Sequence, residues 1–139
     1  MIYVTRKEHF TAAHRLHNPE KSPEWNQATF GPCNHPNWHG HNYEIEVTVA
    51  GEPDPETGYV VDLGKLKHVI RDRIIAKCDH KNLNLDVGFL EGVIPSAENL
   101  AKSFFYELQD DVAAICKNGT LHSVKLFETE RNIAEYREN

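Results

Sequence analysis

The sequence predicts an α+β fold: a four-stranded antiparallel sheet with two helices on one face, in the order ββααββ. Alternating apolar residues near the amino terminus indicate strands, because successive strand side chains point to opposite faces. Two later stretches repeat apolar residues every three or four positions behind a capping residue, which is typical of amphipathic helices. The length of 139 residues suits a single domain, residues 1–139, without internal repeats.

The first two strands are predicted at residues 2–15 and 39–50. In the first strand one parity is mainly apolar and ends on a histidine: Ile2, Val4, Phe10, Ala12 and His14. In the second strand the residues of one face are His39, His41, Tyr43, Ile45, Val47 and Val49. Residues 16–38 contain several prolines and glycines, so we expect a long loop, and such loops in compact domains are usually functional.

The two helices are each predicted from a cap. Asp62 is expected to cap a helix that runs to about Cys78. Ser96 is expected to cap a second helix of about 20 residues, which Asn118 and Gly119 would close.

Two further strands are predicted at residues 120–128 and 132–137. Four strands under two long helices leave two sheet edges open. Because open edges must be protected or paired, we expect the chain to associate through them.

The bulk composition narrows the class of protein. The formal net charge is −6 and the basic residues do not run together, which argues against a nucleic-acid partner. No apolar stretch approaches the roughly 20 residues of a membrane span, and the first residues lack the apolar core of a signal peptide. We therefore expect a cytoplasmic protein without a membrane partner. Three widely spaced cysteines disfavour a disulfide framework.

Three histidines are expected to meet at one end of the sheet. His39 and His41 open the second strand, and strand alternation places both rings on one face. His14 ends the first strand, which in an antiparallel pair lies beside the start of the second. Three histidine ligands leave a fourth position open, the pattern of a catalytic rather than a structural zinc ion. The competing interpretation, unrelated polar histidines, is disfavoured by the spacing.

Cys33 lies in the loop just before the histidine pair. A loop thiol near a cation can become a thiolate and act as a base or nucleophile. Two alternatives stay open on the residues alone: an inert, half-buried thiol and a fourth zinc ligand. Cys78 and Cys116 are interpreted as structural because they stand at helix ends.

Three acid or base side chains are weaker candidates. Asp79 and His80 follow the first helix and can tune a proton relay, although a capping aspartate beside a surface histidine is the simpler interpretation. Glu128 ends the third strand on its apolar parity, where a carboxylate needs a partner. That partner is either a salt bridge, which residue type alone favours, or a ligand with adjacent N–H donors.

Five segments in order carry a resemblance to a known family: residues 10–16, 33–43, 79–84, 97–101 and 128–129. Together they resemble the 6-pyruvoyl-tetrahydropterin synthase family over nearly the whole chain. The resemblance implies the tunnelling fold, in which three ββααββ units close their sheets into a barrel. Two such trimers would stack as a homo-hexamer, with active sites between subunits.

The resemblance also implies a role for each candidate residue. His14, His39 and His41 would hold Zn²⁺, Cys33 would be the catalytic base, Asp79 and His80 its relay partners, and Glu128 the pterin anchor. The substrate would be 7,8-dihydroneopterin triphosphate, from which triphosphate is eliminated to give 6-pyruvoyl-tetrahydropterin without a redox cofactor. Candidates for holding the triphosphate are Arg15, Lys81 and other local Lys or Arg side chains.

This chain departs from the family pattern at two places. Trp38 stands where a glycine commonly precedes the His-Gly-His unit, and Ser96-Ala97 replaces a common Thr-Thr.

Three other functions compete with this one. The closest is 6-carboxytetrahydropterin synthase, a lyase of queuosine and deazapurine biosynthesis that converts the same substrate and releases acetaldehyde. The six-position separation of Cys33 and His39 resembles the pyruvoyl-forming branch, by a narrow margin. More remote alternatives are a non-catalytic zinc-binding module with a closed four-ligand site and a generic zinc hydrolase.

Overall fold

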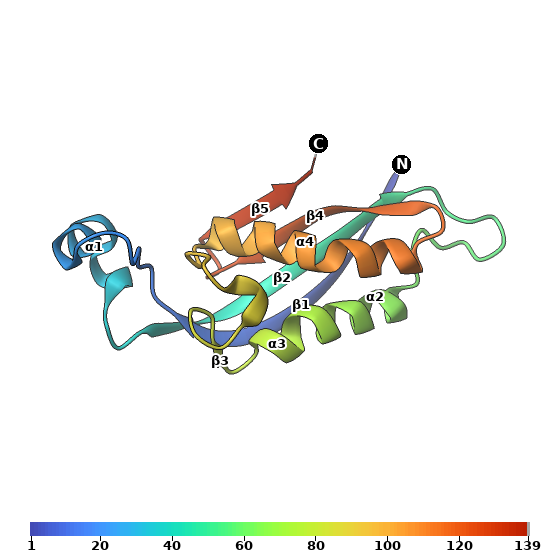
Figure 1. The fold of residues 1–139 in the computed structure, drawn as a ribbon. Coiled ribbons are helices and arrows are strands. Elements are labelled where there is room, and N and C mark those ends of the chain that lie inside the picture. The colour runs from blue at the N-terminus through green and yellow to red at the C-terminus, as the bar shows by residue number, and fades with distance from the viewer. Residues whose placement is uncertain (139) are drawn as a thin grey trace.

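The computed structural model describes residues 1–138 and shows one sheet with helices α2 (Leu63–Ile70) and α4 (Ala97–Ile115) on the same face (Figure 1). The expected α+β class is confirmed. The sheet has five strands in the order β3-β1-β2-β4-β5. Their bounds are β1 Ile2–His14, β2 His39–Gly51, β3 Lys81–Asn82, β4 Gly119–Phe127 and β5 Ile133–Arg137.

The prediction of a four-stranded, purely antiparallel sheet is wrong. β3 pairs in parallel with β1 at Ala12 and Ala13, so the sheet is mixed. The backbone N–H groups of His80 and Leu83 also donate to the carbonyls of Thr11 and Ala13, at 2.6 and 2.8 Å. A strand of two residues has no alternation to detect, and tertiary pairing alone creates it.

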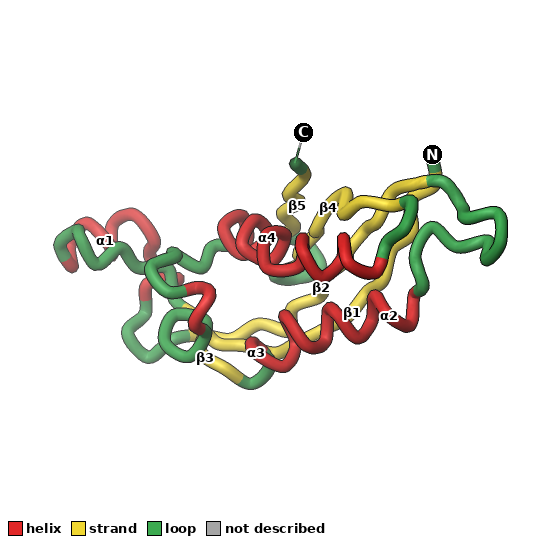
Figure 2. The backbone as a smooth tube through the Cα atoms, turned by 45° about the vertical axis from the view of Figure 1, so that its right-hand side comes forward, coloured by secondary structure: helices red, strands yellow, loops and turns green. Residues whose placement is uncertain are grey.

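The core lies between the sheet and the two helices. β1 pairs with β2 along its whole length, from Ile2 opposite Gly51 to His14 opposite His39. Beneath the helices, the ring of Phe10 stacks on that of Tyr43 at 4.9 Å and packs edge-on against Phe104 at 5.9 Å. In both views the opposite face of the sheet carries no helix (Figures 1 and 2).

The two predicted helices are present; the first has its predicted bounds, Asp62 to Cys78, and the second ends earlier than expected. Asp62 caps α2, which continues through a π-helical turn, η2 (Arg71–Ile75), into α3 (Ala76–Cys78). Ser96 caps α4, but α4 ends at Ile115, so the predicted closure at Asn118 and Gly119 is wrong. Gly119 instead opens β4 opposite Gly51, where an added Cβ on Gly51 would contact the Asn118 carbonyl.

The expected loop at residues 16–38 contains helix α1 (Pro23–Phe30) and the 3-10 turn η1 (Gly31–Asn34). Pro23 does not prevent helix α1 from forming, because it occupies the first turn of that helix, directly after the Ser22 cap. The buried Asn26 amide donates to the Asn18 carbonyl at 2.9 Å and closes the segment. The N–H of Leu16 donates to the carbonyl of Cys33 at 2.8 Å, which returns η1 to the end of β1.

No helix within residues 1–138 combines the length and apolar character that a membrane span requires.

Candidate metal centre and active site

The three predicted histidines meet at the end of the β1–β2 pair. The strand register places His14 opposite His39 and Ala12 opposite His41, so all three rings lie on the helix side of the sheet. One ligand nitrogen from each ring lies within 4.8 Å of the others. Among the residues that the structure describes, this is the only group of three or more histidine, cysteine or acidic side chains placed to hold a metal ion.

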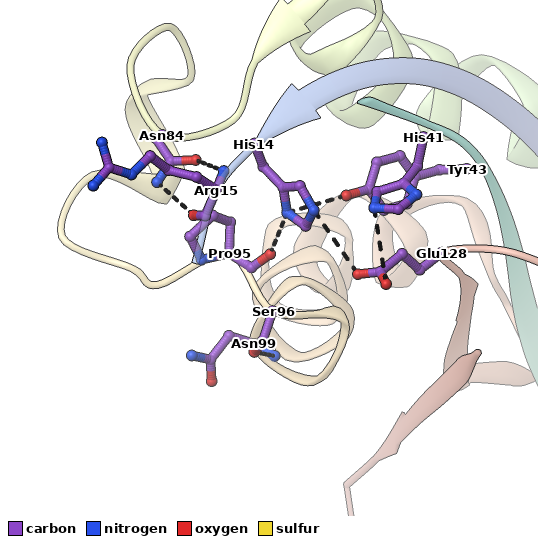
Figure 3. A network of polar contacts seen from close by, with 9 residues as sticks. All are labelled: His14, Arg15, His41, Tyr43, Asn84, Pro95, Ser96, Asn99 and Glu128. Atoms are coloured by element: carbon purple, nitrogen blue, oxygen red, sulfur yellow. Dashed lines mark hydrogen bonds and ion pairs between the residues drawn. The ribbon is translucent and has the colours of Figure 1, made fainter. Parts of the chain in front are cut away.

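A backbone carbonyl fixes the orientation of His14. Its Nδ1 donates to the carbonyl of Pro95 at 2.8 Å (Figure 3), so the proton resides on Nδ1 and the Nε2 lone pair is free. The cap of α4 holds that carbonyl in place. The hydroxyl of Ser96 accepts the Asn99 N–H at 3.2 Å, and the Asn99 amide donates to the carbonyl of Ile94 at 2.9 Å.

Two of the ring nitrogens lack any hydrogen-bond partner in the described chain. They are the buried Nε2 atoms of His14 and His41. Glu128 approaches them at 4.0 and 3.9 Å, too far for a hydrogen bond. A buried unsatisfied nitrogen costs about 1–3 kcal/mol, and a bound cation would remove that cost. The residues therefore fit a metal ion, and three imidazoles are a zinc ligand set.

Lowered pKa values keep the His14 and His39 rings uncharged, the form that binds a cation. The pKa of His14 is lowered from 6.5 to about 4, chiefly by burial; the hydrogen bond with the Pro95 carbonyl opposes this shift, and the neighbouring His39 and His41 add to it. Burial, followed by the effect of His41, also lowers the pKa of His39, while Glu128 opposes the shift. Burial raises the pKa of Tyr43, whose hydroxyl lies 3.3 Å from Nδ1 of His14, so that hydroxyl stays protonated.

Glu128 faces the histidines from the end of β4 (Figure 3). The pairing of β2 with β4 ends at Glu44 opposite Phe127, so the first residues of β2 lack a neighbour on that side. A cavity of about 530 Å³ lies there, lined by His41, Asn42, Glu128 and Thr129 among others. Within residues 1–138 no Lys or Arg side chain lies in ion-pair range of Glu128. Glu128 therefore does not form the salt bridge to a basic side chain that its residue type favours.

Cys33 lies in η1 with an exposed thiol. It does not belong to the group of ligand atoms formed by the histidines, so the described chain does not place it as a fourth ligand. The interpretation of Cys78 as structural agrees with its burial, which raises the pKa of that thiol to about 12.

Nδ1 of His80 lies 3.0 Å from a carboxylate oxygen of Asp79. Asp79 also accepts the N–H of Thr11 at 2.9 Å, which lowers the pKa of the Asp79 carboxyl, and His80 adds to that effect. The His80 side chain is 83% exposed. Within residues 1–138 no hydrogen bond or ion pair links this dyad to Cys33 or to the three histidines.

Sequence reasoning missed the carbonyl of Pro95, because a backbone carbonyl carries no residue-type signal. It did single out Trp38, and the structure gives a physical reason for the glycine commonly found there. Trp38 has a φ of 66°, in the left-handed region that glycine adopts without steric cost.

Comparisons with known proteins agree with this geometry. A family model described as 6-pyruvoyl tetrahydropterin synthase matches residues 3–139. The chain is 42% identical over 134 residues to 6-pyruvoyl tetrahydrobiopterin synthase of Homo sapiens, covering 96% of this chain and 90% of that one. The solved 6-pyruvoyl tetrahydropterin synthase of Caenorhabditis elegans superposes with a TM-score of 0.89 at 38% identity, covering 99% and 96% of the two chains. A more distant relative, 6-carboxy-5,6,7,8-tetrahydropterin synthase of Rickettsia typhi, is 28% identical over 97% of this chain and 99% of its own.

We predict that the folded chain binds one Zn²⁺ through the three histidines. His14→Gln or His41→Gln should lose the metal after dialysis, whereas Cys33→Ala should retain it, because the thiol is outside the ligand group. Metal content per chain, measured by plasma mass spectrometry, tests this, with the exposed α2 residue His68→Gln as control. Loss of zinc from Cys33→Ala would show that the site has four protein ligands.

We also predict a pH-dependent stability of the metal-free protein. Unfolded His14 takes up a proton near pH 6.5, but the folded protein takes it up only near pH 4, so the unfolded state binds more protons between these values. Stability should therefore fall by about 3 kcal/mol from this group as the pH drops from 6.5 to 4. Denaturant unfolding across this range, compared with His14→Gln, isolates the effect. Parallel pH profiles for the two proteins would contradict it.

Proposed function

Because this chain belongs to the 6-pyruvoyl tetrahydropterin synthase family, we propose that it is a zinc-dependent lyase that eliminates triphosphate from 7,8-dihydroneopterin triphosphate, giving 6-pyruvoyl-tetrahydropterin. The observation that carries the proposal is the pair of unpartnered histidine Nε2 atoms that face the Glu128 carboxylate beside a cavity. Such a site offers a cation position next to an acceptor for N–H groups, which a pterin with an oxygenated side chain requires.

Glu128 is the proposed anchor of the pterin ring. Its carboxylate can accept hydrogen bonds from the ring amide and amino groups at the same time, and charge-assisted bonds of this kind are strong. The ring would then occupy the cavity, and its side chain would point to the three histidines. When bound there, zinc supplies Lewis acidity to the side-chain oxygens.

Cys33 is the proposed base that moves a carbon-bound proton of the substrate side chain, with Asp79 and His80 as its relay partners. Since no hydrogen bond or ion pair joins the dyad to Cys33 or to the histidines within residues 1–138, the proposal includes a second copy that contributes residues to each site. The sheet edges at β3 and β5 are where copies would join, in a homo-hexamer of two stacked trimers. A cytoplasmic location is part of this proposal.

The second candidate is 6-carboxytetrahydropterin synthase, because it shares the substrate and the histidine ligands. Two observations favour the pyruvoyl-forming reaction. The separation of Cys33 from His39 resembles that branch, and the chain is more similar to the human enzyme than to the carboxy-forming relative of Rickettsia.

We predict 6-pyruvoyl-tetrahydropterin and inorganic triphosphate as the products from 7,8-dihydroneopterin triphosphate. Chromatography with mass detection identifies the pterin, and an acetaldehyde assay excludes the alternative. Cys33→Ala should lose turnover by at least about a hundredfold, the lower end of the range for losing a general base, while retaining zinc. Release of acetaldehyde with 6-carboxytetrahydropterin would overturn the assignment.

We predict that two inactive variants regain activity when their subunits are mixed. In a shared site, Cys33→Ala damages one side and Asp79→Asn the other, so hybrid oligomers contain some sites with both residues intact. The variants are co-refolded from denaturant and assayed for pterin product against each variant alone. No recovery in oligomers shown by native mass spectrometry to be mixed would place the whole site within one chain.

A further inference from the structure

Arg15 is a cation without a counter-charge at the border of the metal centre. It directly follows His14 and extends to the side away from Glu128 (Figure 3). No carboxylate within residues 1–138 lies in ion-pair range of Arg15, in contrast to the arginines Arg6, Arg71, Arg73 and Arg137. The Nε atom of Arg15 is buried and has no hydrogen-bond partner in the described chain.

The neighbours of Arg15 orient its guanidinium without neutralising it. One terminal nitrogen lies 2.7 Å from Nδ1 of His17, which also accepts the Asn34 amide at 2.9 Å. Burial and the adjacent positive charge of Arg15 lower the pKa of His17, so this ring stays an uncharged acceptor. Asn84 clamps the Arg15 backbone, accepting its N–H and donating to its carbonyl, both at 3.0 Å.

Trp38 also contacts the guanidinium of Arg15. The Arg15 guanidinium carbon lies 5.5 Å from the centroid of a Trp38 ring, within the range of a cation–π interaction. Trp38 reaches this position with a φ of 66°, which is costly for a bulky side chain. Strain of this kind persists where the surrounding structure enforces it and is concentrated at ligand sites. The strained residue and the unpaired cation therefore point to the same ligand.

A cavity of about 270 Å³ lies beside this pair. Arg15, His17, Trp38 and Asn84 are among its lining residues, and no acidic side chain lines it. Ile94 also lines it, one residue before the Pro95 carbonyl that holds His14. The cavity therefore adjoins the metal centre and is suited to an anion.

We propose that Arg15, backed by Trp38, binds the triphosphate of the pterin substrate. The inference rests on the proposed function, which places the ring at Glu128 and the side chain at the histidines. Glu128, His14 and Arg15 follow one another across the site in the same order as ring, side chain and triphosphate in the substrate (Figure 3). The planar guanidinium matches phosphate oxygens in pairs, which a lysine ammonium does not.

The other nearby cations are less suited to this role. Lys81 is exposed on the edge strand β3, and within residues 1–138 its ammonium has no cation–π contact with an aromatic ring. Arg131 lines a separate cavity together with Glu98 and Glu128, whose negative charges oppose a polyanion.

Calorimetric titration of the full zinc-loaded chain with inorganic triphosphate tests the proposal. Arg15→Gln should weaken binding roughly ten- to a hundredfold, the effect of losing charged hydrogen bonds. Trp38→Gly should weaken it by a smaller factor and Trp38→Phe least, because phenylalanine keeps an aromatic ring. Arg73→Gln, which removes the same charge from the helix surface, should bind like wild type. Because triphosphate also chelates zinc, the metal-free chain is titrated in parallel and should show the same ranking.

Kinetics give a second measurement. Arg15→Gln should raise KM by a similar factor with little change in kcat, as expected for an interaction made equally in the ground and transition states. Dihydroneopterin, which lacks the triphosphate, should bind Arg15→Gln and wild type alike. Equal affinity of folded Arg15→Gln and wild type for triphosphate would overturn the inference.

Two controls separate the possible failures. If Arg15→Gln does not fold, Arg15→Lys takes its place: weaker triphosphate binding supports the proposal and unchanged binding overturns it. The binding measurements need no turnover, so absence of any pterin product from the wild-type protein would overturn the proposed function separately.

Discussion

The antiparallel register between β1 and β2 is the constraint on which the site depends. With His14 opposite His39 and Ala12 opposite His41, three rings stand together on the helix face. A shift of one residue would turn His14 to the other face of the sheet. The same shift would expose Phe10, which is buried beneath the helices and stacked on Tyr43. The hydrophobic packing that stabilises the sheet therefore also assembles the metal centre.

A second constraint joins the helix layer to this sheet end. The carbonyl of Pro95, fixed by the cap of α4, sets the tautomer of His14, and Asn84 clamps the backbone of Arg15. Both contacts come from the connection between α3 and α4, about 70–80 residues away along the chain from their partners. Ligand geometry at the histidines thus depends on how this connection packs, so changes there would alter metal binding without touching a ligand.

Features that depend on interactions between residues close in the sequence were predictable, and features that depend on contacts between distant segments were not. The histidine positions were predictable because alternation along a strand is local, and the caps Asp62 and Ser96 act within one helical turn. β3 was not predictable because only pairing with β1 creates it. The predicted closure of α4 at Asn118 and Gly119 is wrong because Gly119 instead pairs with Gly51, a contact between distant segments.

Most of the unsatisfied polar atoms in this structure lie at the site. They form two groups, one that favours a cation and one that favours an anion. The unpartnered Nε2 atoms of His14 and His41, with the Glu128 carboxylate nearby, favour a cation. Arg15 has no carboxylate in ion-pair range within residues 1–138 and contacts the strained Trp38, so it favours an anion. Either ligand alone would relieve only part of the cost, so a metal ion and a polyanionic substrate should stabilise the chain through separate contacts. This separation explains how a chain of net charge −6 can accept a triphosphate, because the attraction is local and lies beyond the acidic anchor.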